Sequence, residues 1–292
     1  MTLRTIVCAG LLLATLGVPG RAEEVTGALP DASRIVSIGD SITEIIYALG
    51  EESRLVGRDS TSTFPDAATK LPDIGYMRAL SPEGVLSINP TAIIAVEGSG
   101  PKETIDVLKK ASVPMVSVPE SYSGPGIVGK VEVVGKALGA EAKAKALAGE
   151  LEKKLASAAA ETKDIQERKR VLFILSAQGG KILSSGTKTA ANGIIELAGA
   201  ENAISGFEGY KPLTDEAIIT AKPDVILVMD RGGDHAAANA DLLANKAIAA
   251  TPAGASKSII RMNGQYLLGF GPRTPNAVHD LAKAIYGDKL SQ

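Results

Sequence analysis

Two glutamates at matching positions of a repeated segment are the first residues in this sequence that could take part in recognition. Glu83 lies in a segment that begins at Leu80, and Glu216 lies in a segment that begins at Leu213, 133 positions later. A carboxylate in the first turn of a helix is favoured by the helix dipole and stays exposed. One such carboxylate on each of two similar units is an arrangement suited to holding a partner at two points.

Each copy of the repeat predicts a short capped helix followed by a buried strand. Ser81 and Thr214 stand where a hydroxyl can accept a backbone N–H of the first turn. A proline then ends each helix, and the apolar runs 92–96 and 225–229 have the composition of strands buried on both faces. Two copies so far apart indicate two similar lobes.

The two predicted repeat strands end in comparable loops. Glu97-Gly98-Ser99-Gly100 follows the first strand, and Asp230-Arg231-Gly232-Gly233 follows the second. Ligands of open α/β sheets bind beyond the carboxyl ends of the strands. If the lobes face one another, we expect these loops to line a shared cleft.

Strands and helices are predicted to alternate from residue 34 onward, which is typical of a mostly parallel sheet flanked by helices. Further strands are expected at 35–38, 55–57, 115–118, 171–175 and 265–268, and further helices at 41–49, 101–111, 190–198, 241–248 and 275–286.

A stretch rich in Ala, Glu, Lys and Leu, residues 140–162, predicts one helix roughly 35 Å long. A surface helix packed on one domain would have the same composition, but its position between the two repeat copies favours a linker. The predicted fold class is α/β, with two Rossmann-like lobes of mostly parallel sheets joined by one long α-helix. The expected boundaries are an N-terminal lobe at 31–126, a helical segment at 127–168 and a C-terminal lobe at 169–292.

The N-terminus has the pattern of a secretory signal. Arg4 precedes an apolar run over 6–18, and small residues allow cleavage after Ala22, so residues 1–22 are predicted to be a signal peptide. Cys8, the single cysteine, lies too early in that run for a typical lipoprotein anchor. The formal net charge of −2 gives no indication of a nucleic-acid partner. A periplasmic location is expected.

Four motifs give the chain a resemblance to a known family. It resembles the periplasmic binding proteins that supply vitamin B12, siderophores and haem to ABC importers, and is most similar to the haem-binding branch. The motifs are the opening block 35–50, the segment 73–84 with Gly75-Tyr76-Met77-Arg78, the segment 206–213 and the segment 269–275. The resemblance implies a monomeric transport protein, not an enzyme, that captures haem in an interlobe cleft and delivers it to an ABC permease.

The resemblance also implies roles for individual residues. Tyr76 would be the axial ligand of the haem iron, since a phenolate is a hard donor suited to ferric iron. Arg78 would stabilise the phenolate or pair with a haem propionate, and Arg231 would hold a propionate from the second lobe. His235 is a candidate second ligand.

Three further expectations follow from the same resemblance. Glu83 and Glu216 match the positions at which the family presents carboxylates to arginines of the permease. Phe207 and Tyr210 are candidates for apolar cleft wall, although core or surface packing would explain them equally. The stretch 176–180 lacks the histidine that some haem-binding relatives carry early in the second lobe, which argues against a two-haem or His-ligated arrangement.

Other ligands remain open within the binding class. An aromatic content of 3% without tryptophan is lean for a porphyrin pocket, so a siderophore or cobalamin is the main alternative cargo. Two histidines are few for a zinc carrier.

An enzyme of a different class is the second alternative. Gly39-Asp40-Ser41 resembles the nucleophile block of GDS-type esterases, with Ser41 as the nucleophile. Those enzymes need a late Asp-x-x-His, and here Asn276 stands in place of the aspartate before His279. Ser41 could instead cap a helix, with Glu44 completing a capping box.

Overall fold

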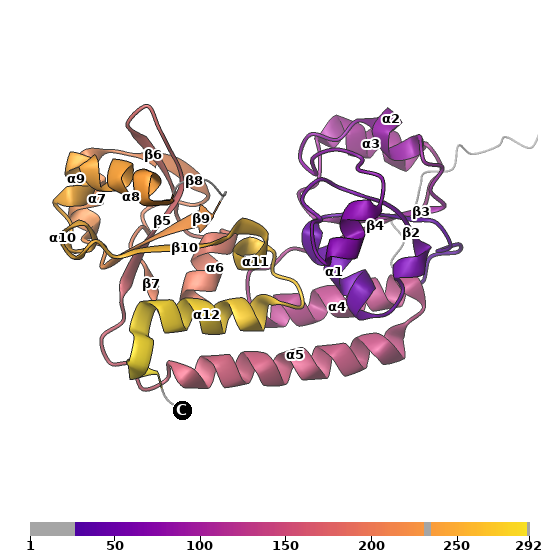
Figure 1. Ribbon diagram of the computed structural model, residues 1–292. Helices are drawn as coiled ribbons and strands as arrows, with labels where there is room; N and C mark the ends of the chain where they lie inside the picture. The colour runs from indigo at the N-terminus through magenta and orange to yellow at the C-terminus, as the bar shows by residue number, and fades with distance from the viewer. Residues whose placement is uncertain (1–26, 231–234, 291–292) are drawn as a thin grey trace, which may run out of the picture.

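The computed structural model describes residues 27–230 and 235–290 and contains two α/β lobes (Figure 1). Helix α5 (Glu141–Glu161) runs beneath both lobes, as the sequence predicted for 140–162. It packs along α4 (Gly124–Leu138), which follows the last strand of the N-terminal lobe, and against α12 (Thr274–Tyr286) of the C-terminal lobe. One long helix therefore joins the two lobes.

The N-terminal lobe contains a four-stranded parallel sheet in the order β2-β1-β3-β4. Its strands are buried because helices lie on both faces, which accounts for their continuous apolar sequences. The strands are β1 (Ile35–Ile38), β2 (Leu55–Arg58), β3 (Ala92–Val96) and β4 (Met115–Val118), and the helices are α1 (Asp40–Ala48), α2 (Pro82–Leu86) and α3 (Lys102–Lys110), with 3-10 turns at Glu52–Arg54 and Asp66–Lys70.

The C-terminal lobe contains a mixed sheet in the order β10-β9-β5-β6-β8, with β7 paired to β5. β5, β7, β9 and β10 pair in parallel, whereas β6 and β8 are antiparallel additions that the sequence did not predict. The strands are β5 (Arg170–Gln178), β6 (Lys181–Ser185), β7 (Glu201–Asn202), β8 (Tyr210–Leu213), β9 (Val225–Asp230) and β10 (Ile259–Asn263).

The helices of this lobe correct two predictions. The strand predicted at 265–268 is wrong, because Asn263 accepts the N–H of Tyr266 at 3.0 Å and begins α11 (Gly264–Leu268) directly after β10. The helix predicted at 241–248 is broken at Asn245, which caps a new short helix. The helices are α6 (Ala190–Leu197), α7 (Asp215–Ala221), α8 (His235–Ala244), α9 (Lys246–Ala249), α10 (Pro252–Ser256), α11 and α12, followed by a 3-10 turn at Gly287–Lys289.

The repeated helix–strand unit is present in both lobes as α2–β3 and α7–β9. Ser81 Oγ accepts the N–H of Gly84 at 3.0 Å, and Thr214 Oγ1 accepts the N–H of Ala217 at 3.2 Å. Both predicted caps are therefore confirmed.

One hydrophobic cluster extends through both lobes. It includes Ile127 of α4, Leu151 of α5, Phe173 of β5 and Leu281 of α12, each almost completely buried. The lobes thus share a core at their base, while separate clusters fill the outer face of each sheet. No helix among the described residues is long and apolar enough to cross a membrane.

Candidate functional site

Tyr76 lies on a loop that follows β2 and precedes α2. Gly75 takes φ +101°, a left-handed conformation that glycine adopts without a Cβ penalty, and turns the chain into this loop. Asp73 anchors the turn by accepting the N–H of Gly75 at 2.9 Å and pairing with Arg58 at 2.8 Å. The Tyr76 ring is 48% exposed. The loop therefore presents an accessible phenol on a braced backbone.

Arg78 lies close enough to phenols of both lobes to affect their ionisation. Burial raises the pKa of Tyr122 and of Tyr210, and the Arg78 charge opposes both shifts by favouring the phenolates. Tyr122 follows β4 of the N-terminal lobe, and Tyr210 begins β8 of the C-terminal lobe. The Arg78 charge therefore acts on tyrosines of both lobes.

Aromatic packing holds these two phenol rings in place. The Tyr122 ring meets the Phe270 ring edge-on at a centroid distance of 5.2 Å, and Tyr210 packs similarly on Phe173 at 6.4 Å. Both contacts are edge-to-face, one of the arrangements that aromatic pairs prefer. Phe207 packs instead against the outer cluster of the C-terminal lobe, with Lys211 Nζ 5.2 Å from its ring centroid.

Tyr122 was not among the residues singled out from the sequence. Its position four residues after β4 places it beyond the carboxyl end of a parallel strand, where ligands of open α/β sheets bind. That rule, applied to every predicted strand, would have found it.

The structure does not describe the side chains of two candidate ligand residues. Arg231 lies outside the described residues. His235 is the first residue of α8, but its side chain is not described. Both roles stay predictions.

Glu83 and Glu216 occupy equivalent places in α2 and α7. Each lies in the first turn of its helix and is exposed. Within the described parts of the chain, neither carboxylate forms a salt bridge. Both are accessible for contact with another molecule.

The residues of the esterase alternative do not come together. Ser41 is 1% exposed and its Oγ accepts a hydrogen bond from Lys130 Nζ at 3.2 Å. His279 Nδ1 is 2.7 Å from Glu161 Oε2 at the end of α5. The predicted capping box is also wrong, because α1 begins at Asp40 with Gly39 as its N-cap, which leaves Ser41 inside the helix.

A cavity of about 480 Å³ lies within the C-terminal lobe, between α8 and the sheet. Its lining comes from that lobe alone and includes Ile174, Val228, Leu242 and Arg261. Arg78 and Tyr122 do not line it, so it is separate from the interlobe phenols. The described residues contain no cluster of His, Cys, Asp and Glu that could hold a bare metal ion.

Comparisons with known proteins agree with this architecture. The sequence matches the profile of the periplasmic binding protein family over residues 35–266. The structure is similar to the periplasmic heme-binding protein RhuT from Roseiflexus sp. RS-1, with 38% identity, a TM-score of 0.83 and coverage of 89% of this chain and 100% of that one.

Two further relatives extend the comparison. The periplasmic heme-binding protein BhuT, solved in complex with two hemes, is 38% identical with a TM-score of 0.81 and covers 86% of this chain and 97% of its own. The uncharacterized ABC transporter substrate-binding lipoprotein YvrC of Bacillus subtilis strain 168 is 28% identical over 272 residues, which are 90% of this chain and 82% of that protein.

Proposed function

The chain belongs to the periplasmic binding protein family, and we propose that it captures haem between its lobes and delivers it to an ABC permease. Residues 1–22 would direct export and be removed, and the lobes would comprise 31–126 and 169–292. The protein would act as a monomeric carrier and not as an enzyme.

The observation that carries the proposal is the exposed phenol of Tyr76 beside Arg78, a cation whose charge acts on tyrosines of both lobes. A phenol with an ordinary pKa of about 10 binds ferric iron near neutral pH only if the metal and a nearby cation favour the anion. Arg78, two residues after Tyr76 on the same loop, would supply such a cation when iron is bound. The full-length similarity to two proteins described as heme-binding supports haem as the cargo.

The surrounding residues fit a flat apolar ligand with acidic edges. Tyr122 and Tyr210 present aromatic surface from opposite lobes, and their rings are already held by Phe270 and Phe173. Arg78, with Arg231 as a second proposed partner, would pair with the propionates. Such an arrangement would put apolar contacts in the middle of the ligand and cations at its edge.

Delivery would use the two glutamates of the repeat. Glu83 and Glu216 are exposed on separate lobes, so a permease with two cations at the same spacing would bind both carboxylates and orient the loaded carrier. Exposed ion pairs contribute little stability, so these carboxylates would set orientation and encounter rate.

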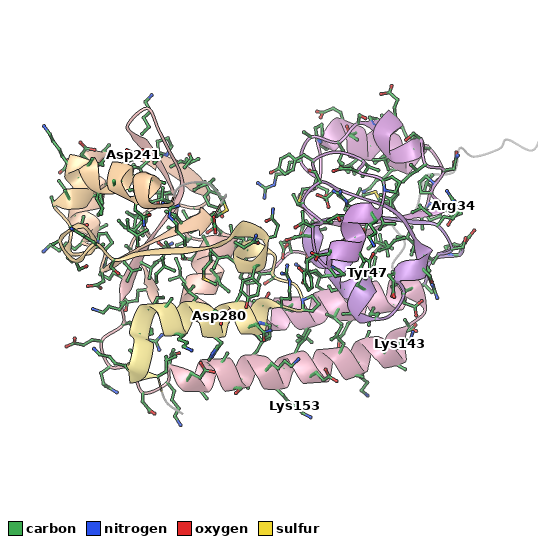
Figure 2. The ribbon with its side chains drawn as sticks, in the orientation of Figure 1. Arg34, Tyr47, Lys143, Lys153, Asp241 and Asp280 are labelled. Atoms are coloured by element: carbon green, nitrogen blue, oxygen red, sulfur yellow. The ribbon has the colours of Figure 1, made fainter. Side chains whose placement is uncertain are left out.

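Titration of the purified protein with hemin tests the proposed ligand. The wild-type protein should develop the absorption bands of a tyrosinate-bound ferric haem, and Tyr76→Phe should lose them, because phenylalanine keeps the ring but has no oxygen donor. Tyr47→Phe is the matched control, since Tyr47 lies on α1 of the same lobe (Figure 2) and packs against the main hydrophobic cluster.

Two results would contradict the proposal. If hemin gives the same bands with Tyr76→Phe as with wild type, Tyr76 is not the ligand. If the protein binds cobalamin and leaves hemin free, the cargo is wrong although the family assignment stands.

A further inference from the structure

The C-terminal lobe docks onto the first turn of α1, at the place where open α/β sheets usually bind ligands. The sheet order β2-β1-β3-β4 puts the strand reversal between β1 and β3, and α1 begins directly after β1. A Cβ added at Gly269 would lie 2.6 Å from Asp40 Oδ2, and one added at Gly271 would lie 3.3 Å from the Ser41 Cα. Glycine at both positions allows this close approach.

Arg273 binds the N-terminal lobe at the end of this docking segment. Its Nε donates to Glu44 Oε1 at 2.9 Å, and its Nη2 donates to the same oxygen at 2.5 Å. The Glu44 side chain is 5% exposed and that of Arg273 is 24% exposed, so the pair is largely shielded from water. A charge pair in such surroundings is stronger and more costly to break than a surface pair.

Aromatic rings from both lobes hold the Arg273 side chain. The guanidinium carbon lies 3.8 Å from the centroid of the Phe64 ring in the N-terminal lobe and 5.4 Å from that of the Tyr266 ring in the C-terminal lobe. A planar guanidinium can stack on a ring and donate in its own plane at once, which a lysine ammonium cannot do.

The N-terminal side of this contact is itself fixed. Lys130 of α4, with a side chain that is 0% exposed, donates to Glu120 Oε1 at 2.8 Å and to Ser41 Oγ at 3.2 Å. The first turn of α1 is thereby tied to α4, which packs on the linker helix α5. Movement of the C-terminal lobe relative to α1 would therefore change the contact that the 269–273 segment makes with α1.

We propose that Arg273 is a positioning residue for ligand capture. With Glu44 and Phe64 it fixes how the C-terminal lobe sits on α1, and so sets the separation of the surfaces that carry Tyr76 and Tyr210. It does not contact the ligand. The ligand part of this inference rests on the proposed haem function, whereas the interlobe part does not.

The test combines an interlobe distance with ligand affinity. The single cysteine, Cys8, lies within the predicted signal peptide, so the mature protein allows spin labels at Glu103→Cys on α3 and Ala255→Cys on α10, both exposed positions. Double electron–electron resonance on the ligand-free protein then reports the interlobe distance. Arg273→Lys and Glu44→Gln are the conservative variants, in case Arg273→Ala fails to fold.

We expect the label distances to broaden in both conservative variants. The apparent hemin dissociation constant should rise about three- to tenfold, as it does when the binding-competent arrangement falls to between a third and a tenth of the population. The tyrosinate absorption bands should not change, because Tyr76 is untouched. Arg34→Lys is the matched control, since the Arg34 guanidinium donates to the carbonyl oxygens of Asn89 and Ile88 within the N-terminal lobe, and it should alter neither readout.

A lower melting temperature of Arg273→Lys with unchanged label distances and hemin affinity would overturn the inference, because Arg273 would then only stabilise the fold. Unchanged distances in all Arg273 and Glu44 variants would overturn it regardless of hemin. If wild type fails to bind hemin, the proposed function is wrong, and the distance measurement still decides whether Arg273 sets the lobe arrangement.

Discussion

Replacing Asp40 with asparagine should make the protein more stable at pH 8 and reduce the loss of stability as pH rises. Burial between the lobes raises the pKa of Asp40 to about 7, with repulsion from Glu44 and Asp59 adding to the shift and Lys130 opposing it. Its Oδ1 accepts the N–H of Ser41 at 2.8 Å, a role that an asparagine oxygen can fill. The substitution therefore removes the ionisation and keeps the hydrogen bond.

The direction of this pH effect follows from the number of protons that the folded and unfolded states bind. In the unfolded chain an aspartate has a pKa of about 3.9, so between this value and 7 the folded protein binds more protons at Asp40 than the unfolded chain does. The free energy of unfolding must then fall as pH rises through this window. A shift of about three pKa units corresponds to about 4 kcal/mol in total, of which about 2 to 3 kcal/mol falls between pH 5 and pH 8.

Urea unfolding of wild type and Asp40→Asn at several pH values between 5 and 8 measures this contribution. Other titrating groups are common to both proteins, so the difference between the two free energies isolates Asp40. Asp106→Asn is the control, because Lys102 lowers the pKa of this exposed carboxyl. The contribution of Asp106 to the free energy of unfolding therefore changes only at acidic pH, below the measured range. A difference between wild type and Asp40→Asn that is constant across this range would refute the buried-carboxyl explanation.

Two further predictions concern docking and interlobe packing. The double variant Glu83→Ala, Glu216→Ala should abolish haem transport in cells and leave hemin affinity unchanged. The control variant Glu103→Ala, Glu141→Ala also removes two exposed first-turn acids and should leave transport intact. Loss of hemin binding in the Glu83, Glu216 variant would contradict the docking role. Gly193→Ala should cost about 1–3 kcal/mol in urea unfolding, because the new methyl would lie 2.3 Å from the Tyr122 carbonyl oxygen. Gly149→Ala on α5, which has nothing within 4 Å, should instead be neutral or stabilising, and equal effects of the two changes would show that the contact at Gly193 is unimportant.

Local signals in the sequence were reliable where one physical cause dominated. The runs that form β1, β3 and β9 could only be buried strands, and the hydroxyls of Ser81 and Thr214 cap their helices as predicted. The alanine-rich stretch that forms α5 was predicted to within two residues.

Short apolar runs were less informative. Residues 265–268 read as a strand, but the cap at Asn263 makes them helix α11. A run of four residues is too short to show a period that separates the two structures, and the deciding hydrogen bond comes from a residue outside the run. The antiparallel strands β6 and β8 were missed because their sequences are half polar and their pairing depends on the neighbouring strand.

The residues of the candidate site also fall into two groups, those that a local motif identifies and those that depend on the tertiary structure. Tyr76 and Arg78 lie two positions apart on one loop, and the turn at Gly75 is local, so a motif in the sequence could identify them. Tyr210 and Tyr122 come near Arg78 only because the lobes face one another, and their altered pKa values depend on that arrangement.

The sequence by itself determined the α/β class, the two lobes and the repeated unit with its exposed glutamates, since periodicity, capping and composition act over short stretches of chain. Only the tertiary structure decided whether the Gly39-Asp40-Ser41 block is a nucleophile site or part of the contact between the lobes. Its carboxylate and serine lie under the C-terminal lobe, and Glu44 is paired with Arg273, 229 positions away. No local pattern links residues at that separation, because their contact arises from the shared core that brings α1, α4, α5 and α12 together.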